Sequence, residues 1–390
     1  PKTRAAAKFL LDRDLDPTTV TRDLSRIFLG RNIQCAQCHD HPLIEDYKQE
    51  HYYGLQAFLN RSFLFPNAQA PTAVIAEKAD GDINFVSVFD KNKTQHSTLP
   101  KILSGKPVPE PKPEKGKEYR VAPAKDVRPV PAYSRREKLA AAMTSPANVA
   151  FARNAVNRLW AMMMGRGIVN PVDLDHGSNP PSHPELLDLL ASEFIAHRYD
   201  VKWLIHQIAL SEIYQRSSEV PATLSDVPAD RYLVATLKPL SPEQLAYAAL
   251  QATGQTDSER AALGAKGTEA QLDARLAPRV PPFRSMFAAR AGESQDGFSS
   301  TLDQTLFLKF GGAVRGMIAP RPGNLADRLA KLRDPGALAD ELFLSVLSRR
   351  PTTDEQKDVM EALNQASSRN TAIGELIWAL VATAEFRFNH

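Results

Sequence analysis

The segment from residue 100 to residue 131 carries eight prolines, with lysine and glutamate residues between them. Proline has no backbone N–H and fixes its own φ, so this composition favours an extended, polyproline-like chain that cannot pack a hydrophobic core. We therefore expect residues 100–132 to form a linker or a long strap, with the globular parts of the chain on either side of it.

Helical patterns dominate both sides of this segment. Residues 18–30 place Val20 and Leu24 on one face and stop at a glycine, and residues 47–59 continue with a second apolar stripe. From residue 133 onwards, helical periodicity with capping patterns recurs almost to the C-terminus. The sequence predicts a mainly α protein, an irregular multi-helix bundle.

One stretch has a different texture. Residues 72–90 are rich in β-branched and aromatic side chains around the turn-prone Asp80-Gly81-Asp82, which predicts a small β-hairpin or sheet inserted around these residues. The predicted organisation is a helical domain at 1–65 containing both cysteines, a small β segment at 66–99, the proline-rich linker or strap at 100–132 and a C-terminal helical domain at 133–390.

Charge and hydropathy exclude some classes of partner. The formal net charge is +3, and acidic and basic residues are interspersed, so the chain has no electrostatic footprint for nucleic acid. No run of eighteen apolar residues is present, so no transmembrane segment is expected.

The chain's two cysteines occur in Cys35-Ala36-Gln37-Cys38-His39. This spacing is typical of c-type haem attachment, in which the thiols bind the haem vinyl groups and the adjacent imidazole ligates the iron. The sequence predicts covalent haem c, attached through Cys35 and Cys38 with His39 as the proximal ligand. The haem pocket is expected to be lined by apolar side chains of the flanking helices, namely Phe28, Phe58 and Leu59.

Two other interpretations of the motif stay open. A Cys35–Cys38 disulfide would close a small loop, with little gain in chain entropy and no use of His39. A zinc site would use the two thiolates together with His39, and Asp40 and His41 would supply further ligands.

A second concentration of polar residues lies between Asp173 and Pro184. Its carboxylates and imidazoles, including His176 and His183, would bind a metal or a sugar, or reach the haem. The alternative is that Ser182 caps the following helix and the acidic and histidine side chains are solvated.

Covalent haem attachment normally follows export, so the motif favours a periplasmic or cell-surface location. The sequence starts with Pro1 and not with Met. We expect further sequence upstream, where a signal peptide would lie.

Several strings resemble a large family of planctomycete cytochrome-associated proteins built from two paired domains of unknown function. They are the segment Cys35 to Pro42 (CAQCHDHP), the segment Phe151 to Trp160 (FARNAVNRLW) and the segment Asn179 to Asp188 (NPPSHPELLD). The resemblance implies an exported bacterial protein, often with an upstream cytochrome c domain and sometimes with carbohydrate-binding modules. It also implies two shared clusters, one made of Cys35, Cys38, His39, Asp40 and His41, and the other containing His183.

Together these observations predict an exported c-type haem protein. It would transfer single electrons to a redox partner protein, or act as a haem-dependent oxidoreductase accessory in polysaccharide metabolism, with carbohydrate as a further partner. The alternative is a structural or assembly protein of the cell envelope, in which the motif is a disulfide-stapled turn or a zinc site.

Overall fold

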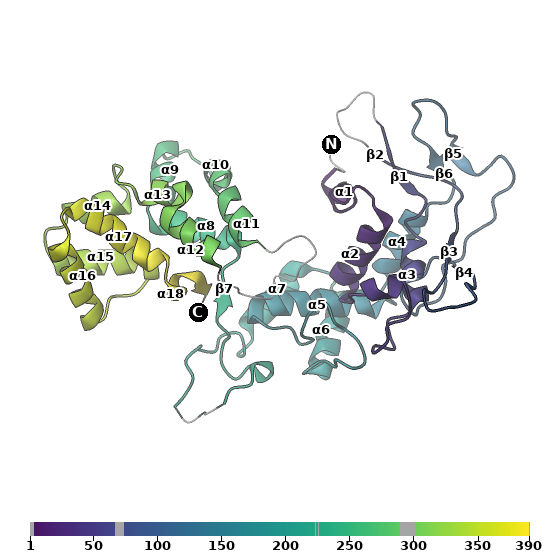
Figure 1. Ribbon diagram of the computed structural model, residues 1–390, viewed down its shortest axis with the longest axis horizontal. Coiled ribbons are helices and arrows are strands. Elements are labelled where there is room, and N and C mark those ends of the chain that lie inside the picture. The colour runs from purple at the N-terminus through teal and green to yellow at the C-terminus, as the bar shows by residue number, and fades with distance from the viewer. Residues whose placement is uncertain (1–3, 67–73, 223, 225, 289–300, 390) are drawn as a thin grey trace. The chain divides into compact units, whose positions relative to one another are not determined.

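The structure, a computed structural model, describes residues 4–66, 74–222, 224, 226–288 and 301–389. The chain divides into two compact units, Pro1–Thr236 and Leu237–His390 (Figure 1). Buried apolar clusters lie within each unit, so each has its own core.

The first helices of the first unit have ends that the local sequence dictates. The Asp16 side chain accepts a hydrogen bond from the N–H of Thr19, and Pro17 occupies the first turn of α2. Gly30 ends α2 in the left-handed conformation at φ 69°, which glycine adopts without steric cost. The elements up to the first sheet are α1 (Arg4–Leu11), α2 (Pro17–Leu29), the 3-10 turn η1 (Gln34–Gln37) and α3 (Gln49–Gln56).

Three two-stranded antiparallel sheets follow α3 along the chain. The predicted β insertion is confirmed, but it is not one hairpin, because its strands pair in opposite directions along the chain. Ile75 pairs back with Leu64, whereas Phe85 pairs forward with His96. The pairs are β1 (Ser62–Phe65) with β2 (Val74–Glu77), β3 (Ile83–Phe85) with β4 (His96–Thr98), and β5 (Tyr119–Val121) with β6 (Val130–Pro131).

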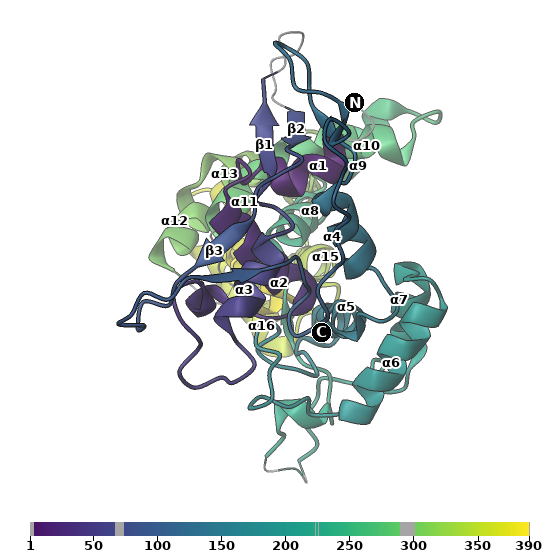
Figure 2. The same ribbon diagram turned by 90° about the vertical axis from the view of Figure 1, so that its right-hand side faces the viewer.

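The remainder of the first unit is helical. Ser134 caps α4 by accepting from the N–H of Glu137, and Gly165 ends α5 in the left-handed conformation. α5, α6 and α7 lie side by side (Figure 2). The bounds are α4 (Arg135–Met143), α5 (Val149–Met164), α6 (Pro184–Ala196), α7 (Val201–Leu210) and η2 (Ala229–Arg231).

Helices from both sides of the proline-rich segment share one core. Leu139 and Met143 of α4 belong to the same buried cluster as Leu24 of α2 and Leu55 of α3. The boundary between compact units consequently falls at Thr236–Leu237 and not at residues 100–132. It also divides residues 133–390, which the sequence indicates as a single helical domain.

The proline-rich segment lies along the first unit as a strap. The N–H of Val108 donates to the carbonyl of Pro100 at 2.7 Å, and the Val108 side chain packs against the shared core. Glu110 forms ion pairs with Arg61 and Arg135, which lie before and after the segment in the sequence. An extended chain thus becomes ordered through side-chain contacts rather than through a core of its own.

The second unit is a helical bundle that starts and ends in one short sheet, because β7 pairs with β8. Reciprocal capping boxes begin four of its helices, as at Ser241 and Gln244. The elements are β7 (Lys238–Pro239), α8 (Pro242–Ala252), α9 (Gln255–Leu263), α10 (Glu269–Leu276), η3 (Ala277–Arg279), α11 (Pro281–Phe287), α12 (Leu302–Phe310), α13 (Gly312–Ile318), α14 (Leu325–Lys331), α15 (Pro335–Leu347), α16 (Thr353–Gln365), α17 (Arg369–Val381), α18 (Ala384–Arg387) and β8 (Phe388–Asn389).

The architecture is therefore mainly α with small β insertions, as the sequence predicts. Within the residues described, no helix combines the length and the apolar character that a membrane span requires.

Candidate functional site

The two cysteines lie on the exposed side of the 3-10 turn η1. Ala36, between them, is fully buried in the core formed by α2 and α3. The N–H of Cys38 donates to the carbonyl of Cys35 at 3.3 Å, which closes the turn. Since the buried Ala36 fixes which side faces the core, Cys35 and Cys38 are both exposed as free thiols.

His39 follows the turn with a defined ring orientation. Its Nδ1 lies 2.6 Å from the carbonyl oxygen of Asp40. A carbonyl oxygen only accepts hydrogen bonds, so the proton of the neutral ring is on Nδ1 and the lone pair is on Nε2. The ring packs against Phe89, with 4.5 Å between ring centroids.

Exposed apolar side chains lie near the motif in space or in sequence. Val88 and Phe89 are 65% and 73% exposed, and the N–H of Val88 donates to the carbonyl of Cys38 at 2.9 Å. Leu43, five residues after Cys38, is 83% exposed. We call Leu43, Val88 and Phe89 the apolar rim.

The apolar side chains expected around a haem lie elsewhere. Phe58 and Leu59 are buried in the core of the first unit, and Phe28 packs between the rings of Phe9 and Phe151. They stabilise the packing of the first unit instead. Phe28 lies between α1 and α5, and Phe58 and Leu59, just after α3, belong to the buried cluster that also contains Leu24 of α2. The sequence did not identify the apolar rim as a surface near the cysteines. Val88 and Phe89 lie in the predicted β segment, and no helical periodicity links them to Leu43.

Asp40 and His41 hold the local chain together. The Asp40 carboxylate accepts from the N–H of Gln49 at 2.8 Å, which caps the start of α3, and lies 3.4 Å from Lys48 Nζ. Nδ1 of His41 accepts from the N–H groups of Leu43 and Ile44 at 3.1 and 3.0 Å. Across the parts of the chain that are described, no three Cys, His, Asp or Glu residues are gathered in a way that would hold a metal ion.

The second polar segment meets the motif through Tyr47. The Tyr47 ring is buried between His41 and His176, at centroid distances of 5.9 and 5.6 Å. Burial raises the pKa of Tyr47 well above its usual range. The N–H of Gly177 donates to the Asp46 carboxylate at 2.6 Å, which fixes the loop next to the motif.

His183 lies apart from this contact. Its Nδ1 is 3.1 Å from Ser182 Oγ, and its ring packs 5.8 Å from that of Tyr232. His183 itself, and not Ser182, occupies the N-cap position of α6, because the Ser182 hydroxyl donates to the carbonyl of Ile168. Of the two histidines predicted in this segment, the structure brings only His176 close to the motif.

Two protein-family models match this chain, one on each side of the proline-rich segment. The family model described as PSCyt2, protein of unknown function (DUF1549), matches residues 5–63. The model described as PSD1, protein of unknown function (DUF1553), matches residues 135–305. The chain belongs to the family that pairs these two domains. Neither the curated proteins nor the solved structures give a match.

The two domains of this paired family meet at a polar seam. Asp173 of the DUF1553 domain is buried between the guanidinium groups of Arg26 and Arg158, with 3.3 Å to Arg26 Nη1. Arg158 also donates to the carbonyl of Arg26 at 2.6 Å. Asn154 donates to the carbonyl of Ile27 at 2.7 Å. The polar side chains of the FARNAVNRLW string thus bind the end of α2.

Backbone pairing continues the seam. The N–H of Asn32 donates to the carbonyl of Asp173 at 2.9 Å, and the N–H of Asp175 donates to the carbonyl of Gly30 at the same distance. These bonds place the 173–177 loop directly beside the chain that enters η1. Asp173 is therefore part of the connection between the domains and is not free to bind a ligand.

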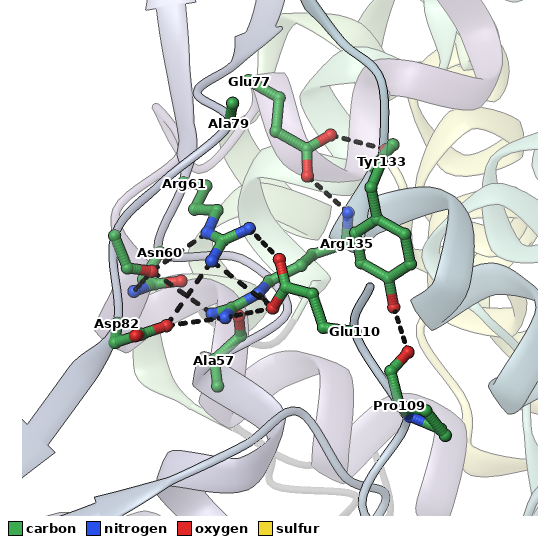
Figure 3. Close-up of polar contacts among 12 residues, drawn as sticks. Ala57, Asn60, Arg61, Glu77, Ala79, Asp82, Pro109, Glu110, Tyr133 and Arg135 are labelled. Atoms are coloured by element: carbon green, nitrogen blue, oxygen red, sulfur yellow. Dashed lines mark hydrogen bonds and ion pairs between the residues drawn. The ribbon is translucent and has the colours of Figure 1, made fainter. Parts of the chain in front are cut away.

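A second cluster joins the domains through the strap (Figure 3). Arg135 is 1% exposed and donates to Glu110 Oε2 at 2.6 Å and to Asp82 Oδ1 at 2.7 Å. Arg61, 5% exposed, binds the same two carboxylates. Arg135 lowers the pKa of Asp82 by donating to its carboxylate.

This cluster had no signal in the sequence. Glu110 lies between two prolines in a segment that also contains Glu114, and nothing in the pattern separates the two glutamates. Yet Glu110 is largely buried between two arginines, whereas Glu114 pairs only with the exposed Lys117. The difference arises from how the strap crosses the first unit.

Proposed function

We propose that this protein is an exported haem c protein that transfers single electrons, with Cys35 and Cys38 as the attachment residues and His39 as the iron ligand. The observation that carries the proposal is the arrangement of these three side chains. Two exposed thiols share one 3-10 turn, and the histidine after them directs its proton to a backbone carbonyl.

The state of His39 suits an iron ligand. Metal-binding histidines commonly donate the N–H of their other ring nitrogen to a backbone carbonyl or a carboxylate, which fixes the tautomer and raises the basicity of the ligating nitrogen. The Nδ1 contact with the Asp40 carbonyl has this form. Among the described residues no hydrogen bond occupies Nε2 of His39, so this atom is free for iron.

The exposure of the cysteines suits covalent attachment. Thioether formation needs both thiols within reach of the haem and of the attachment machinery, and both are exposed. A haem held here supplies one-electron redox chemistry. The apolar rim would supply apolar contacts to the porphyrin, and the exposure of the motif would allow a redox partner protein to approach.

Electron transfer is favoured over an oxidoreductase role in polysaccharide metabolism. That role would need the 173–183 segment to hold carbohydrate. Asp173 is instead enclosed by Arg26 and Arg158, and the amide of Gly177 is bound to Asp46. These contacts connect the two domains, so Asp173 and the Gly177 amide are already engaged and would not bind a sugar.

The zinc interpretation receives less support than haem. Zinc at a structural site takes four ligands, and Asp40 and His41 already serve the start of α3 and the turn after the motif. Recruiting them would break these contacts.

The proposed haem attachment also implies a location. We propose that the protein acts in the periplasm or on the cell surface, where haem c is normally attached.

The deciding experiment is expression with export in a host that carries the cytochrome c maturation machinery. We expect the pyridine haemochrome spectrum of haem c and a mass increase of one haem that survives denaturation. The Cys35→Ser/Cys38→Ser double variant should lose the added haem mass, whereas each single variant keeps one thioether and should shift the α band of the pyridine haemochrome. His39→Ala should change the visible absorption bands that report on iron ligation while retaining covalent haem.

His206→Ala provides the matched control, because His206 is exposed on α7, away from the motif. This variant should keep both mass and spectrum. Protein without haem that contains one zinc per chain, or a Cys35–Cys38 disulfide in non-reducing peptide mapping, would favour the structural alternative and overturn the proposal.

A further inference from the structure

A cleft of about 200 Å³ lies where the β5–β6 hairpin meets the start of α4, and three arginines line it. Arg120 comes from β5, Arg128 from the chain leading into β6, and Arg136 from the first turn of α4. We call it the arginine cleft. It is separate from the cysteine motif and does not depend on the proposed haem function.

Arg136 carries a charge that is only partly balanced. Its Nε is buried and has no hydrogen-bond partner within the described part of the chain, although Glu77 Oε2 lies 3.4 Å away as an ion-pair partner. Burial lowers the pKa of Arg136, and the neighbouring positive charge of Arg128 acts in the same direction. Arg128 and Arg136 thus bring two like charges to the lining of one cleft.

The nearest carboxylate is already engaged. Glu77 is 1% exposed; its Oε1 accepts from the N–H of Arg135 at 2.7 Å, and its Oε2 accepts from the Ser134 hydroxyl at 2.5 Å. Its charge thus stabilises the start of α4 and is shared with Arg136. It leaves little to neutralise the other two arginines.

Arg120 and Arg128 have no acidic partner among the residues that the structure describes. Arg120 donates to the carbonyl of Ala132 at 3.2 Å, which holds its guanidinium at the cleft. Among the described residues, no carboxylate lies within ion-pair distance of Arg120 or Arg128. The second acidic residue of the lining, Glu137, is exposed and makes no ion pair with a described residue.

We propose that the arginine cleft binds a compact oxyanion group, namely a sulfate, phosphate or carboxylate. Guanidinium groups recognise such anions through paired, charge-assisted hydrogen bonds, and an anion between Arg128 and Arg136 would relieve their mutual repulsion. A water molecule occupies about 30 Å³ in the liquid, so the cleft has room for the oxyanion and part of the molecule that carries it.

The test is isothermal titration of the full chain with sodium sulfate, sodium phosphate and sodium acetate, each against sodium chloride at equal ionic strength. We expect saturable binding of at least one of the three. Preference for sulfate and phosphate would indicate a tetrahedral dianion, and equal or stronger binding of acetate would indicate a carboxylate.

Two variants assign the binding to this cleft. Arg128→Ala should weaken it about tenfold, since Arg128 would donate charge-assisted hydrogen bonds. Lys125→Ala removes the same charge from the same hairpin outside the cleft and should change affinity less than about twofold. Both side chains are exposed, and circular dichroism verifies that both variants are folded.

A third variant tests the direction of the charge effect. Glu137→Gln removes a negative charge from the lining, so binding should tighten by a few-fold. Absence of anion binding beyond the chloride control would overturn the proposal. Equal losses in Arg128→Ala and Lys125→Ala would also overturn it, because they would indicate general charge attraction and not a site.

Discussion

A Cβ atom on Gly30 would lie 2.7 Å from Oδ1 of Asn154. The end of α2 and the side of α5 therefore touch without room for a methyl group, and Asn154 uses this closeness to bind the carbonyl of Ile27. Gly30 also has φ 69°. Two independent requirements thus select glycine where the DUF1549 domain contacts the DUF1553 domain.

We predict that Gly30→Ala destabilises the first unit by about 2–4 kcal/mol, combining the left-handed backbone with the steric clash. Urea unfolding measures the effect. Trp160 and Trp203 lie in the first unit and Trp378 in the second, so a Trp378→Phe background makes tryptophan fluorescence report on the first unit alone.

Gly116→Ala separates the two contributions. Gly116 has φ 86°, but a Cβ there would meet nothing within 4 Å. This variant should cost only about 1 kcal/mol, from backbone strain. Equal losses in the two variants would show that contact with Asn154 adds nothing.

Asp173→Asn should destabilise the first unit by about 3 kcal/mol, because it leaves Arg26 and Arg158 facing each other without their shared carboxylate. Asp175→Asn is the matched control, since Asp175 contributes a backbone bond to the seam and its carboxylate forms no ion pair with any described residue. It should shift the urea midpoint little. A small effect of Asp173→Asn would contradict the role of this ion pair in holding the domains together.

Glu110→Gln should release the strap. The change removes the charge between Arg61 and Arg135, and we expect a loss of about 2–4 kcal/mol together with faster proteolysis within residues 100–132. Glu114→Gln, in the same segment, removes only an exposed pair with Lys117 and should cost less than about 0.5 kcal/mol. Similar cleavage rates in both variants would contradict the role of the Glu110 ion pairs in holding the strap.

His51 should make stability depend on pH. Burial lowers the pKa of His51 below its ordinary value of about 6.5, so the unfolded chain binds this proton more readily than the folded one. The contribution of His51 to the free energy of unfolding is fully present above about pH 6.5. It is lost as the pH drops toward the folded-state pKa, by at most about 1.4 kcal/mol per pH unit.

The measurement is the urea midpoint between about pH 7.5 and pH 5. His51→Gln should flatten the slope below about pH 6.5, whereas His206→Gln, at an exposed position, should leave it unchanged. Comparing slopes removes any uniform loss from the broken contact with the Asp46 carbonyl. An unaltered slope in His51→Gln would assign the pH dependence to other groups.

Local sequence patterns predicted the helices well, because their ends depend on nearby residues. Gly30 ends α2 in the left-handed conformation at the glycine where the predicted helix stops, and Gly165 and Pro184 likewise end α5 and begin α6. The strand pairs were harder to predict, since Ile75 pairs with Leu64, a residue that precedes the stretch from which the β insertion was predicted. Which strand pairs with which depends on tertiary packing. The two-residue alternation of apolar side chains along a strand does not specify it.

In the candidate site, too, local features could be predicted and tertiary contacts could not. The turn carrying Cys35 and Cys38 and its flanking helices were evident from spacing alone. The contact between His176 and Tyr47 joins residues more than a hundred positions apart, and the choice of His176 over His183 depends on the path of the 173–177 loop. The burial of Glu110 depends in the same way on distant arginines.

The shared core and the polar seam also bear on how such proteins can be divided or recombined. A fragment ending before α4 would lose Leu139 and Met143 from its core, and the Asn32 amide would lose its acceptor at Asp173. The DUF1549 domain and the part of the DUF1553 domain that precedes Leu237 therefore fold as complementary parts of one unit. A chimera that joins these parts from different relatives would need matched residues on both faces of the seam.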